Sequence, residues 1–160
     1  MSHEFIDKMM EQNKTGELRS PVSETLGMRL VEFGRGEAVY EMEAREELGN
    51  PLGVIQGGVA TALADAAMAA ATTTILSDEE IQKSAITTID IFARFIRPVN
   101  AKKVERLRAE AKVVRAGGRL VWAEAELLAD GETVGKFAAT GIRVSFDPQT
   151  YLAERGSSDG

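Results

Sequence analysis

The sequence of 160 residues contains no cysteine, only one histidine (His3) and four prolines, and 6% of its residues are aromatic. The absence of cysteine excludes a disulfide framework, and the N-terminus lacks the charged, then apolar, then small pattern of a secretory signal. We therefore expect a cytoplasmic protein. With 44% hydrophobic residues, the chain can bury the core of one domain without covalent cross-links, and a second domain is not expected.

Charge is unevenly distributed along the chain. The net charge of −6 argues against general binding of nucleic acid, but residues 94–119 contain nine basic and two acidic side chains. One locally basic region in an acidic protein suits a small polyanionic ligand. The alternative is that these basic residues simply lie on strand faces exposed to water, and charge alone leaves both interpretations open.

The hydrophobic pattern divides the chain into three parts. Residues 1–19 place apolar side chains at helical spacing among charged ones, which predicts a short amphipathic helix that packs on the body as a lid or brace. Residues 20–146 form the folded domain. Residues 147–160 lose all periodicity and are expected to be a flexible tail.

Within the domain, one long helix is flanked by strands. Residues 59–76 are rich in alanine and contain neither glycine nor proline, which predicts a single helix. Alternating segments predict six strands, and the last four are joined by short turns and are therefore expected to be antiparallel neighbours. This order gives an α+β domain, an antiparallel sheet with one helix buried against it. The expected strands cover residues 26–33, 37–44, 86–96, 104–115, 120–128 and 134–145.

The long helix is unusually poor in charge. Asp65 is its only charged residue between Gly58 and Asp78, so the helix has no polar face to present to water and should be almost wholly enclosed. A membrane span is excluded, because the run is rich in Ala and Thr rather than Leu and Ile and has an acidic residue near its middle. We expect no membrane association.

Asp65 is the most informative residue of the chain. Aspartate is rarely buried, and burial without a partner costs several kcal/mol. Its helical neighbours Thr61, Ala62, Met68 and Ala69 offer no cation. Two interpretations remain: an ion pair with an arginine from a strand, or a reactive carboxylate lining a pocket, where desolvation would strengthen it as a base or nucleophile.

Gly57 and Gly58 begin the helix, where free backbone N–H groups and the positive end of the helix dipole can bind an anion such as a developing oxyanion. The alternative is that they only permit a tight turn into the helix. Gly57 lies about 12 Å from Asp65 along the helix axis, too far for both to act on one carbonyl group. If both are catalytic, helices from two subunits must lie side by side and antiparallel, so the sequence predicts an obligate dimer with two shared sites.

Two segments resemble the PaaI-type hotdog thioesterases. Residues 50–65, NPLGVIQGGVATALAD, resemble that family's signature of an Asn, a Gly, a His-Gly-Gly and an Asp nine residues after the His, and the spacing from position 56 to 65 fits. Residues 87–99, TTIDIFARFIRPV, resemble the strand that follows, with the same Arg-Pro turn. The resemblance runs from about Leu26 to Ser145. It implies a hotdog fold, an antiparallel sheet wrapped around one central helix, and hydrolysis of an acyl-CoA or aryl-acyl-CoA thioester.

The resemblance also implies residue roles. Asp65 would be the nucleophile or general base, Gly57 the N–H donor of the oxyanion hole, and Asn50 the residue that orients the attacking carboxylate or water from across the subunit interface. Thr88 would hold the hydrolytic water. Strand alternation instead places Thr87 on the apolar face, so Thr87 stays the alternative unless a local bulge shifts the strand.

The departure from the family pattern is Gln56, which stands where the family has His. A glutamine amide can donate a hydrogen bond to the thioester but cannot carry a proton to the leaving thiolate. Because His3 is the only histidine, a His-dependent hotdog dehydratase or hydratase is not expected. The rival function is a non-catalytic acyl-CoA-binding protein, in which Gln56 marks lost activity.

Coenzyme A would give the basic region a ligand, because it carries a pyrophosphate and a ribose phosphate. Arg97 and Arg119 are the candidates for phosphate contacts, and Gly58 and Gly118 are further candidate substrate-binding residues. The protein is expected to form a homo-oligomer, a dimer or a dimer of dimers, to bind no nucleic acid and to need no metal or other cofactor.

Overall fold

The computed structural model describes residues 2–18 and 20–145, so the tail expected over residues 147–160 lies outside the described residues. Most of the expected elements are present, with bounds that differ by a few residues. In chain order the elements are α1 (Glu4–Thr15), α2 (Pro21–Leu26), β1 (Arg29–Gly34), β2 (Glu37–Glu43), the 3-10 helix η1 (Glu46–Leu48), α3 (Gly57–Thr73), α4 (Asp78–Ile81), β3 (Ser84–Phe95), β4 (Arg106–Ala116), β5 (Leu120–Ala129) and β6 (Glu132–Ser145).

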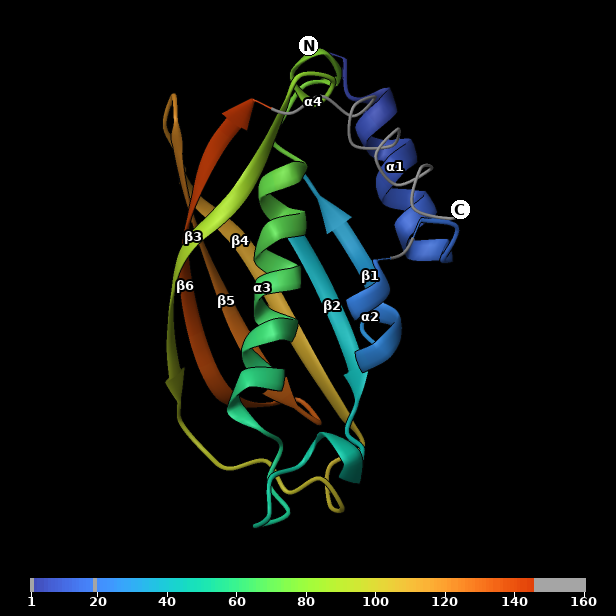
Figure 1. Cartoon of the computed structure of the whole chain (residues 1–160), viewed down its shortest axis with the longest axis vertical. Helices are drawn as coiled ribbons and strands as arrows, with labels where there is room; N and C mark the ends of the chain where they lie inside the picture. Colours follow the sequence, from blue (N-terminus) through green and yellow to red (C-terminus); the bar gives the residue numbers. More distant parts are fainter. Residues whose placement is uncertain (1, 19, 146–160) are drawn as a thin grey trace, which may run out of the picture.

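The six strands form one antiparallel sheet in the order β1-β2-β4-β5-β6-β3. The sheet curls around α3, which packs on β2, β3, β4 and β5 (Figure 1). We call the face of the sheet toward α3 the inner face and the opposite face the outer face. The expected architecture, an antiparallel sheet around one long central helix, is confirmed.

The prediction that β3 and β4 are neighbours is wrong. β3 pairs with β6 at one edge of the sheet, whereas β4 lies between β2 and β5. The connection over residues 96–105 does not fold back as a hairpin; it runs past the loop before α3, where Ile55 N–H donates to Val99 O (2.8 Å). Pro98 has no N–H to offer a sheet, so β3 ends before it and the chain leaves the sheet there.

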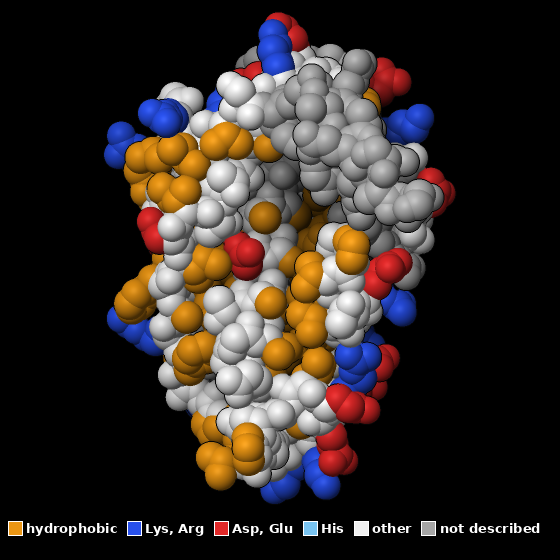
Figure 2. Space-filling model, in the orientation of Figure 1, with side chains coloured by type: hydrophobic (Ala, Val, Ile, Leu, Met, Phe, Trp, Pro, Cys, Tyr) orange, Lys and Arg blue, Asp and Glu red, His pale blue; other side chains and the backbone are white. Residues whose placement is uncertain are grey.

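Helix α3 is buried on one side only. Leu63, Ala64, Ala67 and Ala71 are fully buried against the sheet, and the small alanines let the helix backbone approach the strands closely. The opposite side, including Asp65, is only partly covered, so the expectation of an almost wholly enclosed helix is wrong for a single chain. The physical reason is that one sheet can cover one side of a helix. In Figure 2 this open side is mostly uncharged, with charged side chains largely around its rim.

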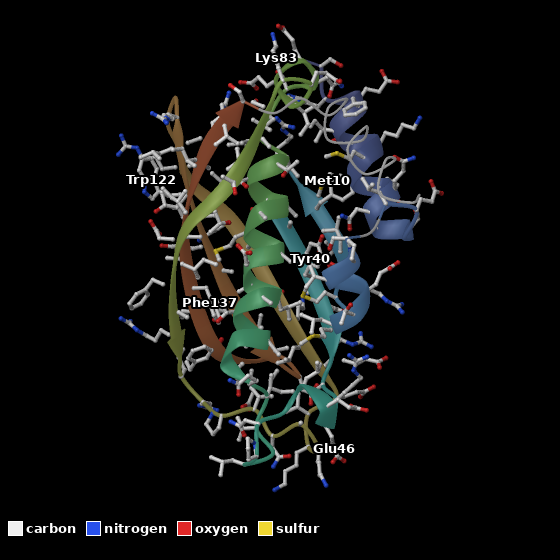
Figure 3. The ribbon with its side chains drawn as sticks, in the orientation of Figure 1. Met10, Tyr40, Glu46, Lys83, Trp122 and Phe137 are labelled. Atoms are coloured by element: carbon white, nitrogen blue, oxygen red, sulfur yellow. The ribbon has the colours of Figure 1, made fainter. Side chains whose placement is uncertain are left out.

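Helix α1 braces the sheet against α4. Ile6 and Met10 are buried, and Asn13 accepts a hydrogen bond from the Tyr40 hydroxyl of β2 (3.3 Å). Figure 3 shows Met10 and Tyr40 on the same side of the sheet as α3. The carboxylate of Asp78 in α4 accepts hydrogen bonds from the first backbone N–H groups of α1. These contacts tie the N-terminal segment to the end of the domain where β3 begins.

Two short α-helices, α2 and α4, and the 3-10 helix η1 were not expected from the sequence. In α2, the side chain of Ser20 accepts from Ser23 N–H, and proline occupies the first helical turn. In α4, Ser77 and Glu80 form a reciprocal capping box. Because α2 ends at Leu26, β1 begins later than expected.

Candidate active site

Asp65 lies on the open side of α3 and has one hydrogen-bond partner among the described residues. Thr88 of β3 donates from Oγ1 to Asp65 Oδ1 over 2.9 Å. No arginine or lysine of the described residues forms an ion pair with Asp65, so the strand arginine considered as its partner is not there within one chain. The carboxylate is left with an oxygen, Oδ2, that no described protein group occupies.

A bulge in β3 explains why Thr88 rather than Thr87 reaches Asp65. Thr88 pairs with Gly141 and Asp90 pairs with Thr140, so Ile89 has no partner of its own in β6. Before the bulge, Ile86 and Thr88 face inward; after it, the alternation is shifted by one residue. Thr87 is exposed on the outer face, where it does not meet Asp65. The structure therefore brings Thr88 to Asp65 and does not bring Thr87 there.

The start of α3 presents free backbone donors. Gly57 and Gly58 are the first two helical residues, and neither N–H finds an acceptor among the described residues, whereas Val59 and Ala60 N–H both donate to Gln56 O (2.9 and 3.1 Å). Gln56 is the N-cap residue, but its exposed side chain makes no capping hydrogen bond. The pair of free N–H groups at the positive end of the helix can bind an oxyanion.

Gly57 is also sterically confined. A Cβ atom at this position would lie 3.1 Å from Cζ of Phe95, which packs edge-on against Phe137. A Cβ atom at Gly58 would meet no atom within 4 Å. The side chain of Phe95 therefore lies against the start of α3 and favours glycine at position 57, but not at position 58.

Asn50 holds the loop in front of α3. Its side-chain oxygen Oδ1 accepts from Leu52 N–H (2.9 Å) and Val54 N–H (3.2 Å), and its backbone N–H donates to Val54 O (2.8 Å). The loop is anchored further by Gln56 N–H, which donates to Leu48 O (2.9 Å). Because Oδ1 is occupied, the Nδ2 amide group of Asn50 is the part left free to donate a hydrogen bond to a ligand.

One chain does not bring these groups together. Eight helical residues place Asp65 about 12 Å along the axis from Gly57, and no described contact joins Asn50 or Gln56 to Asp65. Two hollows of about 610 and 310 Å³ lie elsewhere, and neither is lined by Asp65, Gly57 or Asn50. Within a single chain the candidate residues form two half-sites, Asp65 with Thr88 and the loop with the start of α3.

The edge of the sheet beside these half-sites is exposed and apolar. β3 is the last strand of the sheet, so one side of it has no strand partner. Ile89, Phe92, Phe95 and Ile96 are each between 47% and 60% exposed. Phe92 lies on the outer face, where Arg94 stacks over its ring.

The basic region is only partly available to a ligand. Arg108 donates to three carboxylates, and hydrogen bonds to Glu110 and Glu32 raise its pKa above the ordinary value. Arg97, a candidate phosphate contact, pairs with Glu132 (3.0 Å). Arg119 is exposed beside the equally exposed Gly118 and has no ion pair among the described residues. Arg119 is thus freer to bind a phosphate than Arg97.

The described residues contain no cluster of His, Asp and Glu arranged to hold a metal ion. In the same residues, no helix combines the length and the hydropathy needed to cross a bilayer.

The sequence analysis did not identify two residues that take part in the geometry of the β3 bulge, Asp90 and Gly141. A glycine inside a strand is a known sign of a bulge or of close backbone approach, so Gly141 carried a usable signal.

Comparison with known proteins gives the family. The sequence model of the thioesterase superfamily matches residues 52–136, more than half of the chain. No curated protein sequence matches the chain. Among solved structures, a mutant of the phenylacetic acid degradation protein PaaI from Thermus thermophilus is 28% identical, with 78% of this chain and 100% of that chain covered and a TM-score of 0.70.

Two further structures agree with this. A thioesterase family protein from Silicibacter pomeroyi is 25% identical over 86% of this chain and 99% of its own, with a TM-score of 0.73. The PaaI protein from E. coli, 23% identical over 86% of this chain and 94% of its own with a TM-score of 0.72, bears on the fold alone. The chain therefore belongs to the thioesterase superfamily and is a thioester hydrolase with a PaaI-type hotdog fold.

Proposed function

We propose that the protein hydrolyses an acyl-CoA or aryl-acyl-CoA thioester to the free acid and coenzyme A, without a metal or redox cofactor. The observation that carries the proposal is the hydrogen bond from Thr88 to Asp65 on the open side of α3, the helix that also presents free N–H groups at its first residues, Gly57 and Gly58. The aryl option is supported by the similarity to a PaaI protein named for phenylacetic acid degradation.

The two half-sites become whole if two chains join at their β3 edges. Antiparallel pairing of two β3 strands would continue the sheet across a twofold axis, cover the exposed Ile89 and Phe95, and set the open sides of two α3 helices against each other. The start of one α3 would then face Asp65 of the other chain. The mostly uncharged open side in Figure 2 suits such burial.

Each group then has one task. The thioester oxygen accepts hydrogen bonds from the N–H groups at the start of α3, and Asp65 either attacks the carbonyl carbon or takes a proton from water that does so. Thr88 uses its proton to hold Asp65, so its oxygen lone pairs remain to accept a hydrogen bond from that water. Asn50 Nδ2 can donate to the water or carboxylate from the partner's side.

The leaving group needs little help. When the tetrahedral intermediate collapses, the carbon–sulfur bond breaks and coenzyme A leaves as a thiolate, a good leaving group that takes its proton from solvent. Where Asp65 is the nucleophile, the acyl group is left on its carboxylate as an anhydride, which water then hydrolyses to release the free acid. Gln56 cannot supply that proton, but its exposed amide can donate a hydrogen bond to the thioester. Arg119 is the better candidate for a phosphate of the coenzyme, because Arg97 already pairs with Glu132.

The test is release of free thiol from a panel of aliphatic and aromatic acyl-CoAs, comparing wild type with Asp65→Asn. We expect selective hydrolysis that falls by several orders of magnitude in the variant, while ligand binding persists. Tight binding without thiol release by the wild type would favour the rival function, an acyl-CoA-binding protein in which Gln56 marks lost activity.

Sharing of the site is tested by complementation. Asp65→Asn chains and Gly57→Pro chains are each expected to be inactive as homodimers. Mixed dimers contain one site with both intact halves, so they should recover up to about half of the wild-type activity per dimer. A wild-type chain that stays monomeric at micromolar concentration while hydrolysing the thioester would contradict the shared site.

A further inference from the structure

The side chain of Asp90 bonds the strand opposite the bulge of β3, on the outer face. Its carboxylate oxygen Oδ1 accepts a hydrogen bond from the backbone N–H of Thr140 over 3.2 Å. Thr140 is the residue of β6 that the bulge opposes, because Ile89 and Asp90 together stand across from it. The bond therefore ties the second residue of the bulge to the strand that the bulge faces.

The bulge decides which side chain reaches Asp65. On the inner face, Ile86 precedes the bulge and Ile91 and Ala93 follow it, and all three pack against the core. An odd number of positions separates Ile86 from Ile91, which regular alternation cannot place on one face. With the bulge at Ile89, Thr88 shares the inner face with both sets of residues. In a regular strand that kept Ile91 and Ala93 inward, Thr87 would face inward in place of Thr88.

Two further features indicate a well-defined β-bulge rather than an irregular end of the strand. Ile89, which has no partner in β6, is 54% exposed and takes no part in the core, as expected of the extra residue of a bulge. Opposite Thr88 stands Gly141, where a Cβ atom would lie 2.6 Å from the side chain of Ile86. The glycine leaves room for Ile86 and Thr88 to lie side by side under α3.

Asp90 itself does not touch the candidate site. It is exposed, its described hydrogen bond goes to Thr140, and Asp65 is bonded instead by Thr88. We propose that Asp90 is a positioning residue of the thioesterase, whose carboxylate fixes the bulge at Ile89 and thereby aims the Thr88 hydroxyl at Asp65. Its catalytic consequence rests on the proposed function, but its structural consequence does not.

The experiment compares Asp90→Ala with Asp90→Asn in the full chain. Asparagine keeps an Oδ1 acceptor for Thr140 N–H, whereas alanine removes it. Glu124→Ala is the matched control, because Glu124 is another exposed carboxylate that faces outward, on β5. Asp90→Val, which adds a side chain favoured in strands, replaces the alanine variant if that variant does not fold.

The structural readout needs no substrate. In Asp90→Ala, amide hydrogen exchange at Thr140 should become at least about tenfold faster, and a crystal structure should show the Thr88–Asp65 hydrogen bond lengthened or lost. Asp90→Asn and Glu124→Ala should match the wild type in both respects. Unchanged protection of Thr140 together with an intact Thr88–Asp65 bond in Asp90→Ala would overturn the proposal, whatever the enzyme's activity.

The kinetic readout separates positioning from general damage. With an acyl-CoA that the wild type hydrolyses, Asp90→Ala should lower kcat about tenfold with little change in KM, and Asp90→Asn should restore it. In a Thr88→Ala background, Asp90→Ala should cause no further loss of kcat, because Asp90 acts on catalysis through Thr88. Full additivity of the two changes would overturn the positioning role. If the wild type hydrolyses nothing, the proposed function fails, while the exchange and crystallographic results still decide the role of Asp90 in the bulge.

Discussion

Thr88 and Asp65 lie on different elements, 23 residues apart in sequence, and are joined by a hydrogen bond of 2.9 Å from Oγ1 to Oδ1. The donor is a neutral hydroxyl and the acceptor is a carboxylate, so the bond fixes the orientation of the carboxylate without neutralising its charge. A lysine or arginine in the place of Thr88 would stabilise the charge and weaken the carboxylate as a base or nucleophile. The pairing therefore suits a reactive group better than a structural one.

Replacement of Thr88 tests this relationship directly. Thr88→Ala should lower kcat for thiol release by about 10- to 100-fold, because both the hydrogen bond to Asp65 and the acceptor for the hydrolytic water are lost. Thr88→Ser keeps the hydroxyl and should retain most of the activity. Thr87→Ala is the neighbouring control, since Thr87 lies exposed on the outer face, and it should behave as the wild type. A larger loss in Thr87→Ala than in Thr88→Ala would contradict the assignment.

Two substitutions at Gly57 distinguish the contribution of its N–H group from the steric effect of an added side chain. Both Gly57→Ala and Gly57→Pro place a Cβ atom where Phe95 Cζ is 3.1 Å away, but only proline removes the N–H. Proline is tolerated at the first position of a helix, so the helix should survive. We expect proline to lower kcat about 100- to 1,000-fold beyond the loss caused by alanine. Equal losses in the two variants, measured with the same thiol-release assay, would mean that the N–H does not contribute.

The neighbouring glycine gives a stability control. A Cβ atom at Gly58 meets nothing within 4 Å, so Gly58→Ala should raise the free energy of unfolding of the chain by up to about 1 kcal/mol through better helix propensity. Gly57→Ala should not share this gain, because Phe95 must move. Urea denaturation of both variants measures the difference; a destabilised Gly58→Ala would show that position 58 is covered in the assembled protein.

The local sequence was sufficient for the long helix and the strands, but not for the order of the strands in the sheet. Alanine-rich residues 59–76 identified α3, and alternation identified the strands, because both signals depend on spacing within one element. The pairing of β3 with β6 depends on the path of residues 96–105 across the molecule, which no local pattern encodes. The short apparent turn at Pro98 therefore led to the wrong neighbour for β3.

In the candidate site, too, residues marked by a local pattern could be predicted, whereas those that depend on another strand could not. Asp65 and Gly57 could be found because a lone charge in an apolar helix and a glycine pair at its start are visible in the sequence. The choice between Thr87 and Thr88 depends on a bulge that is visible only in the pairing of β3 with Gly141 and Thr140 of another strand. The openness of α3 in one chain could not be read from composition, because an apolar helix face looks the same whether a sheet or a second subunit covers it.

The exposed edge of β3 predicts where the proposed dimer can be broken. Ile89→Lys places a charge on an apolar residue that is 54% exposed at the unpaired edge, and lysine at a sheet edge opposes strand pairing. We expect the dissociation constant of the dimer to rise at least tenfold (~1.4 kcal/mol) in sedimentation experiments, with activity falling in parallel. Val22→Lys changes a residue of α2 that is 56% exposed away from this edge and should leave the dimer intact. Dissociation by Val22→Lys but not by Ile89→Lys would place the interface elsewhere.

Attachment of α1 should depend on pH through Asp78. Burial acts to raise the pKa of Asp78, but hydrogen bonds from the backbone N–H groups of Phe5 and Ile6 and from the Ser2 hydroxyl outweigh it and lower the pKa below its ordinary value. Because the pKa is lower in the folded state, the carboxylate stabilises the docked helix above the ordinary pKa of an aspartate, and this contribution is lost as the pH falls through the lowered value.

Hydrogen exchange at the start of α1 measures this dependence. Protection of the Phe5 and Ile6 amides, corrected for the intrinsic rate, should be constant from neutral pH down to about pH 4 and should decline below it. Asp78→Ala should lower the protection at every pH, and Asp78→Asn, which cannot titrate, should remove the decline. Glu79→Ala is the adjacent control, because among the described residues the Glu79 carboxylate bonds Lys83 within the same short segment and accepts no hydrogen bond from α1. If the acid-induced loss of protection persists unchanged in Asp78→Asn, another group controls the docking of α1.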